Sequence, residues 1–246
     1  SISKLILEGP LEELNKTENT QPSIFLVSYS IFEVLKKENK IDLKKIKYFA
    51  GHSLGEYSAL ACGGSLQFED TIRLLKERGK AMQSAVPEGK GGMVAILKSN
   101  LETVNNILIE NKNNYKCFVA NDNSEGRMVI SGLNNDFELL INDLKQKSIK
   151  NIKLPVSAPF HCSLMKSATN IMENEIKNAN LKNPICGIIS NVTAKETKDA
   201  SEIKQLLVRQ IENPVRWRES VLYLSKNGVG KIIEIGPGKV LSGLIR

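Results

Sequence analysis

The hydrophobic and polar positions of this chain form a pattern that predicts alternating helices and strands. Apolar side chains cover nearly every side of a helix that begins near Pro22, a residue suited to a first helical turn, so this helix is expected to be buried. The polar stretch 15–21 before it is expected to be a loop. The next elements are expected to be a strand over 46–50 and helices over about 56–62 and 68–83.

A change of pattern near Pro87 predicts a second structural unit. Its elements follow the order strand, helix, strand, strand, helix, strand, which is the order of a ferredoxin-like split unit. They are expected over 93–97, 101–110, 117–120, 128–131, 136–147 and 149–156. We therefore expect 87–153 to be a small inserted domain, and 1–86 together with 154–246 to form a larger one.

The last third of the chain returns to alternating strands and helices. The elements are expected as a helix over 163–179, a strand over 185–191, helices over 200–210 and 218–227, a strand over 231–235 and a helix over 240–245. Such alternation is typical of the α/β class with a mainly parallel sheet. No apolar run approaches the ~20 residues that a membrane-spanning helix needs, so no membrane association is expected.

Composition and charge narrow the classes of partner. The 246 residues are 41% hydrophobic and 25% charged, which is ordinary for a globular protein and excludes a disordered or fibrous one. A net charge of +7 favours anionic partners, but the charge is spread and aromatic residues make up only 5%, so nucleic acid is not expected. The four cysteines lack metal-binding spacing and are expected to be reduced thiols in a cytosol-like compartment, without a metal site.

The segment Gly51-His52-Ser53-Leu54-Gly55 carries the most specific chemical signal. It fits G-x-S-x-G between an expected strand and an expected helix, the setting that makes a nucleophilic serine project from a sharp turn. The Leu54 N–H at the helix N-terminus would then face a developing oxyanion. The alternative is a glycine-bounded loop whose serine only caps the helix.

A serine hydroxyl needs a base, and the chain has only two histidines. His52 adjoins Ser53, and adjacent side chains on such a turn diverge, so a packing or orienting role is expected for it. His161 is the remaining candidate base, placed before a helix whose positive dipole end would keep the imidazole neutral. The alternatives are a histidine that caps the helix or lines a loop, and a nucleophilic Cys162, which its neighbour His161 could not easily activate.

Arg78 is the candidate for binding a substrate anion. It shares one face of its expected helix with the apolar residues Leu74, Leu75, Ala81 and Met82. A buried guanidinium needs an anion or strong hydrogen bonds, and its planar fork suits a carboxylate. The alternatives are an internal Asp or Glu partner and a side chain whose tip reaches solvent.

These segments together resemble a known enzyme family. The resemblance is carried by 51–60 (GHSLGEYSAL), 78–79 (RG), 159–162 (PFHC), 213–217 (NPVRW) and 236–241 (GPGKVL). The chain is similar over almost its whole length to the malonyl-CoA:acyl carrier protein transacylases. The resemblance implies an α/β-hydrolase-like large domain with an inserted ferredoxin-like domain, and an active site between them.

The same resemblance implies roles for particular residues. Ser53 would be the nucleophile, His161 the base and Arg78 the clamp on the malonyl carboxylate. A backbone carbonyl near Gln210 would orient the histidine in place of an aspartate. The substrates would be malonyl-CoA and acyl carrier protein, with no cofactor and no metal, and the site of action a bacterial cytoplasm or an organellar matrix.

The family pattern also opens with a strand and a G-Q-G-S-Q loop that nothing in this sequence matches. The first glutamine of that loop supplies the second oxyanion donor in the family, and the loss of such a donor typically costs ~3 kcal/mol. The present sequence starts about where the family pattern is some forty residues in, and we expect the native protein to possess the strand and the loop.

Two other function classes stay open at this point. A serine hydrolase orders its triad Ser, Asp, His, and Asp122 after the expected 117–120 strand could be its acid. A catalytically impaired module that binds acyl carrier protein is the non-enzymatic alternative.

Overall fold

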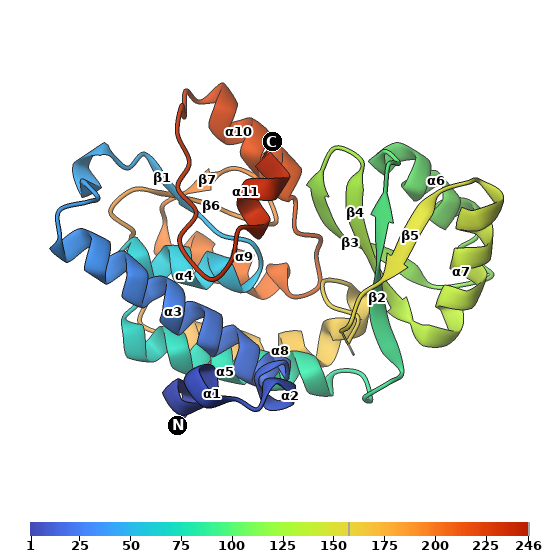
Figure 1. Ribbon diagram of the computed structural model, residues 1–246, viewed down its shortest axis with the longest axis horizontal. Coiled ribbons are helices and arrows are strands. Elements are labelled where there is room, and N and C mark those ends of the chain that lie inside the picture. Colours follow the sequence, from blue (N-terminus) through green and yellow to red (C-terminus); the bar gives the residue numbers. More distant parts are fainter. Residues whose placement is uncertain (157, 246) are drawn as a thin grey trace.

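The computed structural model describes residues 1–156 and 158–245, which form helices and two separate sheets (Figure 1). The chain is thus of the mixed α/β class. The helices outside 87–153 are α1 (Ile2–Glu8), α2 (Leu11–Leu14), α3 (Thr17–Lys37), η1 (Leu43–Lys45), α4 (Leu54–Cys62), α5 (Phe68–Ser84), η2 (Ser163–Met165), α8 (Lys166–Asn178), α9 (Ala200–Gln210), α10 (Trp217–Lys226) and α11 (Val240–Ile245). None of the helices in these described ranges is long and apolar enough to cross a membrane.

The first sheet positions the G-x-S-x-G segment. It has the order β1-β6-β7, from β1 (Tyr48–Ala50), β6 (Gly187–Ile189) and β7 (Glu196–Thr197). β1 and β6 pair in parallel, whereas β6 and β7 are antiparallel. The expected mainly parallel sheet is therefore wrong for the described strands. The loop from β6 to β7 is too short for the crossover that a parallel return requires.

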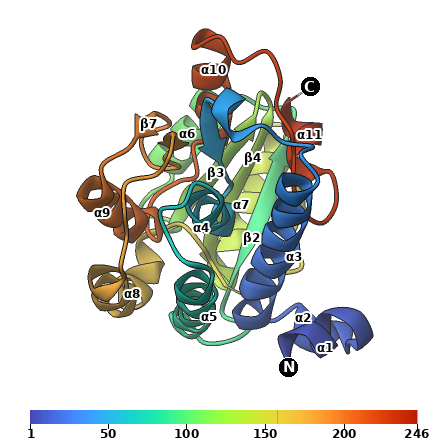
Figure 2. The same cartoon turned by 90° about the vertical axis from the view of Figure 1, so that its left-hand side faces the viewer.

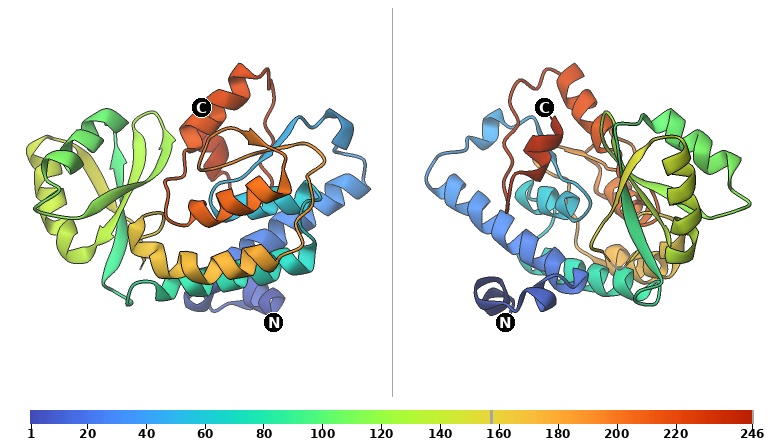
Figure 3. Two further views of the ribbon diagram at one scale, coloured as in Figure 1. Left: turned by 180° about the vertical axis from the view of Figure 1, so that it is seen from behind. Right: turned by 45° about the vertical axis from the view of Figure 1, so that its right-hand side comes forward.

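Helices α3, α5 and α8 lie side by side beneath this sheet, with α4 between them and the strands (Figures 2 and 3). Their shared core is built from buried apolar side chains. These include Phe25, Tyr57, Leu60, Leu74, Leu75, Met172, Ile188 and Leu207. Because side chains from α3, α4, α5, α8 and α9 meet in one cluster, residues distant in sequence are held at fixed positions around α4.

The second sheet is antiparallel and has the order β3-β4-β2-β5. Its elements are β2 (Gly91–Leu97), α6 (Leu101–Glu110), β3 (Cys117–Ser124), β4 (Arg127–Leu133), α7 (Asn134–Gln146) and β5 (Lys150–Lys153). Both helices pack on one face, where alternate strand residues such as Val94, Ile96 and Ile130 are buried. The chain order of elements expected for 87–153 is the one observed.

The two sheets are connected through the segment that precedes α10. The Val215 N–H donates to the Ala120 carbonyl at 2.8 Å, and the Asp122 N–H donates to the Val215 carbonyl at 3.0 Å. Val215 thus extends the edge of β3, and α10 lies between the two sheets in Figure 1.

Three local expectations are wrong. The supposed loop 15–21 is largely helical, because α3 begins at Thr17 and Pro22 lies inside it. The α3 helix is not buried on all sides, since Val34 is 53% exposed. No strand forms over 231–235, where Ile233 is 56% exposed and the segment pairs with none of the described strands.

The early start of α3 has a physical cause in its polar side chains. Thr20 Oγ1 donates to the Leu14 carbonyl at 2.6 Å, and Asn19 Nδ2 donates to the Glu13 carbonyl at 2.8 Å. These bonds satisfy the end of α2 and tie it to the first turn of α3. Polar residues that suggest a loop by composition therefore support a helix here.

Candidate active site

Ser53 lies on a strained turn between β1 and α4. Its φ of 54° and ψ of −112° are rare for a residue with a side chain, and α4 begins at the next residue. A Cβ added at Gly51 would come within 1.9 Å of the Gly55 carbonyl oxygen, whereas one added at Gly55 would meet open space. The close approach of strand and helix therefore requires glycine at 51 but not, on steric grounds, at 55.

The turn is fixed by Asn191, which follows β6. Its Nδ2 donates to the Gly51 carbonyl at 2.7 Å, and its Oδ1 accepts from the Ser53 N–H at 2.7 Å. The Leu54 N–H is the first of α4, and the first N–H groups of a helix have no acceptor within it. The Ser53 N–H is thus used to hold the turn, whereas the Leu54 N–H has no acceptor within its helix.

His161 lies beside Ser53, 108 positions away in the sequence. The Ser53 Oγ and His161 Nε2 are 2.8 Å apart, and His161 Nδ1 is 2.9 Å from the Gln210 backbone oxygen. Because a carbonyl oxygen can only accept, Nδ1 carries the proton and the Nε2 lone pair faces the hydroxyl. The geometry is that of a base held by a backbone carbonyl.

The neutral state of His161 is favoured mainly by its burial. Burial, together with the positive charge of Arg78, lowers the pKa of His161 to about 3. The expected helix begins later than the sequence pattern suggested, because the chain after His161 first forms the short η2 and α8 begins only at Lys166. His161 is therefore an unprotonated imidazole at neutral pH.

The Arg78 guanidinium is buried in the same site, with 1% of the residue exposed. Nη1 donates to Gln21 Oε1 at 2.6 Å, and Nη2 donates to Gln210 Oε1 at 2.8 Å and to Ser53 Oγ at 3.1 Å. All three acceptors are neutral, and no carboxylate in the described part of the chain forms an ion pair with Arg78. The internal Asp or Glu partner considered above is thus not found, and a buried positive charge remains available to an anion.

A glycine next to Arg78 brings Gln21 into reach. A Cβ at Gly79 would lie 2.4 Å from Glu18 Cα, so α3 and α5 can cross this closely only because Gly79 has no side chain. The crossing places Gln21 of α3, which is 3% exposed, directly against the guanidinium.

Gln210 connects the separate parts of the site. Its backbone oxygen binds His161 and its Oε1 binds Arg78, while its Nε2 donates to the Ser53 carbonyl at 3.0 Å and to Glu56 Oε2 at 2.7 Å. Gln210 is fully buried. A single residue at the end of α9 therefore sets the positions of the base, the cation and the serine turn.

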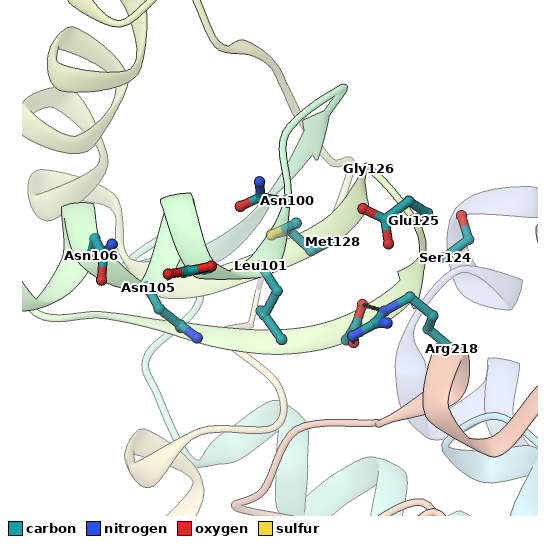
Figure 4. Close-up of a pocket in the computed structure, with 11 residues that line it drawn as sticks. Asn100, Leu101, Asn105, Asn106, Ser124, Glu125, Gly126, Met128 and Arg218 are labelled. Atoms are coloured by element: carbon teal, nitrogen blue, oxygen red, sulfur yellow. Dashed lines mark hydrogen bonds and ion pairs between the residues drawn. The ribbon is translucent and has the colours of Figure 1, made fainter. Parts of the chain in front are cut away.

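Asp122 does not complete a triad. Both of its oxygens accept from Arg218 Nε, at 2.9 and 3.1 Å, and its Oδ2 lies 2.9 Å from Arg218 Nη2. The pair borders a pocket of about 580 Å³ between α6 and α10, whose lining contains neither Ser53 nor His161; Figure 4 shows Arg218 reaching into it from α10. This location disfavours a hydrolase triad that uses Asp122.

Two further sequence candidates occupy structural positions. His52 Nε2 lies 2.8 Å from Asn123 Oδ1, and its ring is 5.8 Å from that of Trp217, so it points away from Ser53. Cys162 is a free thiol that donates to the Pro159 carbonyl, and burial raises its pKa to about 11. A protonated, buried thiol is not a nucleophile.

Sequence patterns missed three residues of the site, namely Gln21, Glu56 and Asn191. Gln21 falls in the supposed polar loop, and Asn191 marks only the end of an expected strand. Glu56 carried a usable signal, because an acid that opens an otherwise apolar helix segment has to find a partner when it is buried.

Comparisons with known proteins agree with this geometry. Residues 1–245 match the acyl transferase domain family, which is the class that the fold and the serine–histidine pair define. The malonyl CoA-acyl carrier protein transacylase of Haemophilus influenzae is 41% identical over 98% of this chain and 77% of its own length. The chain therefore belongs to the malonyl CoA-acyl carrier protein transacylase family.

Two solved structures extend the comparison. The acyl-carrier-protein-S-malonyltransferase of Bartonella henselae is 42% identical with a TM-score of 0.96, covering 100% of this chain and 78% of that one. A malonyl-transacylase in complex with a type II PKS acyl-carrier protein is 39% identical with a TM-score of 0.95, covering 99% and 78%.

Proposed function

We propose that the chain transfers a malonyl group from malonyl-CoA to the phosphopantetheine thiol of acyl carrier protein in fatty acid biosynthesis. One observation carries the proposal: a base at 2.8 Å and a buried, unpaired cation at 3.1 Å meet at the same Ser53 oxygen. Family membership supports the identity of both substrates.

The first half-reaction forms a malonyl ester on Ser53. His161 Nε2 takes the hydroxyl proton while Oγ attacks the thioester carbonyl carbon. The Leu54 N–H and the positive end of α4 stabilise the oxyanion. The carbon–sulfur bond then breaks, and the CoA sulfur leaves with the proton that His161 returns.

The second half-reaction reverses these steps with a different thiol. The pantetheine thiol of the carrier gives its proton to His161 and attacks the ester carbonyl, and Ser53 Oγ leaves and regains the proton. Arg78 holds the malonyl carboxylate through both halves, which keeps the acyl group aligned. Side chains and backbone groups complete every step, so we propose that no cofactor or metal takes part.

The fold and charge support the remaining parts of the proposal. The order β3-β4-β2-β5 with both helices on one face supports a ferredoxin-like insert over 87–153, and a serine turn after β1 supports an α/β-hydrolase-like remainder. The net charge of +7 suits CoA phosphates and an acidic carrier. The relatives named above are bacterial, which supports a bacterial cytoplasm as the location.

Mass spectrometry of the protein after incubation with malonyl-CoA tests the proposal. We expect one malonyl adduct on Ser53, its loss in Ser53→Ala, and its transfer to added carrier protein bearing phosphopantetheine. Release of free malonate in place of transfer would indicate a hydrolase. An adduct on another residue, or one that persists in Ser53→Ala, would overturn the assignment of the nucleophile.

A further inference from the structure

Glu56 is a buried carboxylate that takes no part in the proposed steps. It lies in the first turn of α4 and is 2% exposed. Its Oε2 accepts from Gln210 Nε2 at 2.7 Å and from the Asn191 N–H at 3.1 Å. Both donors are neutral, so the carboxylate is oriented without being neutralised.

Only one carboxamide separates Glu56 from Arg78. Gln210 donates to Glu56 through Nε2 and accepts from Arg78 Nη2 through Oε1, at 2.7 and 2.8 Å. Since Oε1 has to accept from Arg78 and Nε2 has to donate to Glu56, the oxygen and the nitrogen of this amide cannot exchange positions. Glu56 is therefore the carboxylate nearest to Arg78 in this network, and it compensates the buried charge through the amide rather than by contact.

The surroundings of Glu56 leave it close to half ionised near neutral pH. Burial raises its pKa to about 7, while the two hydrogen bonds and the charge of Arg78 limit the rise. Among the described residues, Arg78 from α5 and Tyr57 from α4 are the ionisable groups that interact with it. The loop after β6 and α9 face it with neutral Asn191 and Gln210.

The other ionisable groups of the site do not compete for a proton. Burial raises the pKa of Tyr57 to about 12, and His161, bound to the same Gln210, stays neutral until the pH falls to about 3. Among the residues that bind the Gln210 side chain or backbone oxygen, Glu56 is thus the group whose charge can change near pH 7.

We propose that binding of an acyl group that carries a carboxylate at Arg78 is coupled to uptake of one proton by Glu56. The inference rests on the proposed function, because it takes the malonyl carboxylate as the anion at Arg78. That carboxylate places a second negative charge in the same buried network. It also pairs with Arg78, whose positive charge favours the ionised form of Glu56 in the free protein. Two like charges in one buried site cannot both remain ionised at low cost, so Glu56 becomes protonated.

The coupling makes Glu56 a positioning residue that contributes to specificity. An acyl group without a carboxylate leaves Arg78 unpaired and Glu56 unchanged. The affinity for malonyl-CoA relative to acetyl-CoA should then fall as the pH rises above 7, because each bound malonyl group requires a proton that is less available.

Isothermal titration calorimetry of Ser53→Ala with malonyl-CoA measures the proton directly. The variant binds without forming an ester, and the dependence of the heat on the ionisation enthalpy of the buffer gives the protons taken up. We expect about 0.5 proton or more per site at pH 8 and a value near zero at pH 5.5, where Glu56 is already protonated. Acetyl-CoA carries the same phosphates, so its value is subtracted as the control.

The outcomes separate this inference from the proposed function. Equal proton counts for malonyl-CoA and acetyl-CoA at pH 8, with Ser53 of the unmodified protein still acquiring malonyl, would overturn the coupling alone. Failure of that acylation would overturn the proposed function instead. The same titration in Ser53→Ala/Glu56→Gln should abolish the difference, and a difference that persists would assign the proton to another group. If that double variant does not fold, the proton counts of Ser53→Ala at pH 8 and pH 5.5 still test the coupling, since equal counts at the two pH values would overturn it.

Discussion

Replacement of Arg78 tests whether its charge recognises the substrate or only supports the fold. In Arg78→Ala the malonyl carboxylate would lose its buried cationic partner. Removal of one member of a buried charge pair typically costs about 3 kcal/mol or more, which corresponds to roughly a 10²-fold loss in kcat/KM for malonyl-CoA. Acetyl-CoA lacks that carboxylate and should lose far less.

The structure also predicts a cost that is independent of the substrate. Arg78→Ala leaves the Gln21 and Gln210 side-chain oxygens without their donor, and each unsatisfied buried acceptor costs about 1–3 kcal/mol. Denaturant unfolding should therefore show a less stable protein. This loss affects both substrates equally, so the ratio of their kcat/KM values isolates the recognition of the carboxylate.

The assay compares malonyl and acetyl transfer to carrier protein by the same preparation of each variant. We expect the malonyl-to-acetyl ratio to fall by about 10²-fold in Arg78→Ala, and by less in Arg78→Lys, which keeps a charge but loses the planar fork. If both substrates lose the same factor, Arg78 is a structural residue and the interpretation of its neutral partners is wrong.

Two further predictions concern the carboxylate of Asp122 and the imidazole of His161. Asp122→Asn should change kcat/KM for transfer by less than about 10-fold, because Asp122 binds Arg218 and not the histidine. Loss of a triad acid costs about 10⁴-fold, so a loss of that size in steady-state assays would restore the hydrolase alternative. His161→Gln should lose less unfolding free energy than the parent protein between pH 6.5 and 4.5, by up to about 2 kcal/mol. The reason is that the histidine of the unfolded chain, with its ordinary pKa of 6.5, binds a proton in this pH range, whereas the folded one stays unprotonated until about pH 3. Urea titrations in which the unfolding free energies of the two proteins change in parallel with pH would contradict the burial of His161.

The sequence was most informative where the chemistry is local. The serine turn needs glycine at the end of the strand, and the Cβ clash at Gly51 shows why the first glycine of G-x-S-x-G is required. Arg78 was recognisable because a charged residue on an apolar helix face is costly at any position in a fold. The assignment of His161 relied on a composition with only two histidines, and in a histidine-rich chain the same reasoning would have failed.

The missed features depend on contacts between distant segments. Gln21 and Asn191 are ordinary polar residues by pattern, and they acquire roles only because α3 crosses α5 and because β6 lies beside β1. The early start of α3 depends on polar side chains that bind the end of α2, which composition alone indicates as a loop. The short β7 escaped prediction because a two-residue strand has almost no periodicity.

The neutral partners of Arg78 are consistent with a binding group rather than a structural ion pair. A carboxylate in contact with the guanidinium would lower the cost of its burial, but its negative charge would also repel a substrate anion. Amide oxygens from Gln21 and Gln210 fix the orientation of the fork and leave its charge intact. Under the proposed function, the folded protein keeps this cost until the malonyl carboxylate binds, and Glu56, one amide away, makes the free site tolerable. The same arrangement explains why the site would discriminate by charge and not by size alone, since an uncharged acyl group leaves the buried cation without an anion.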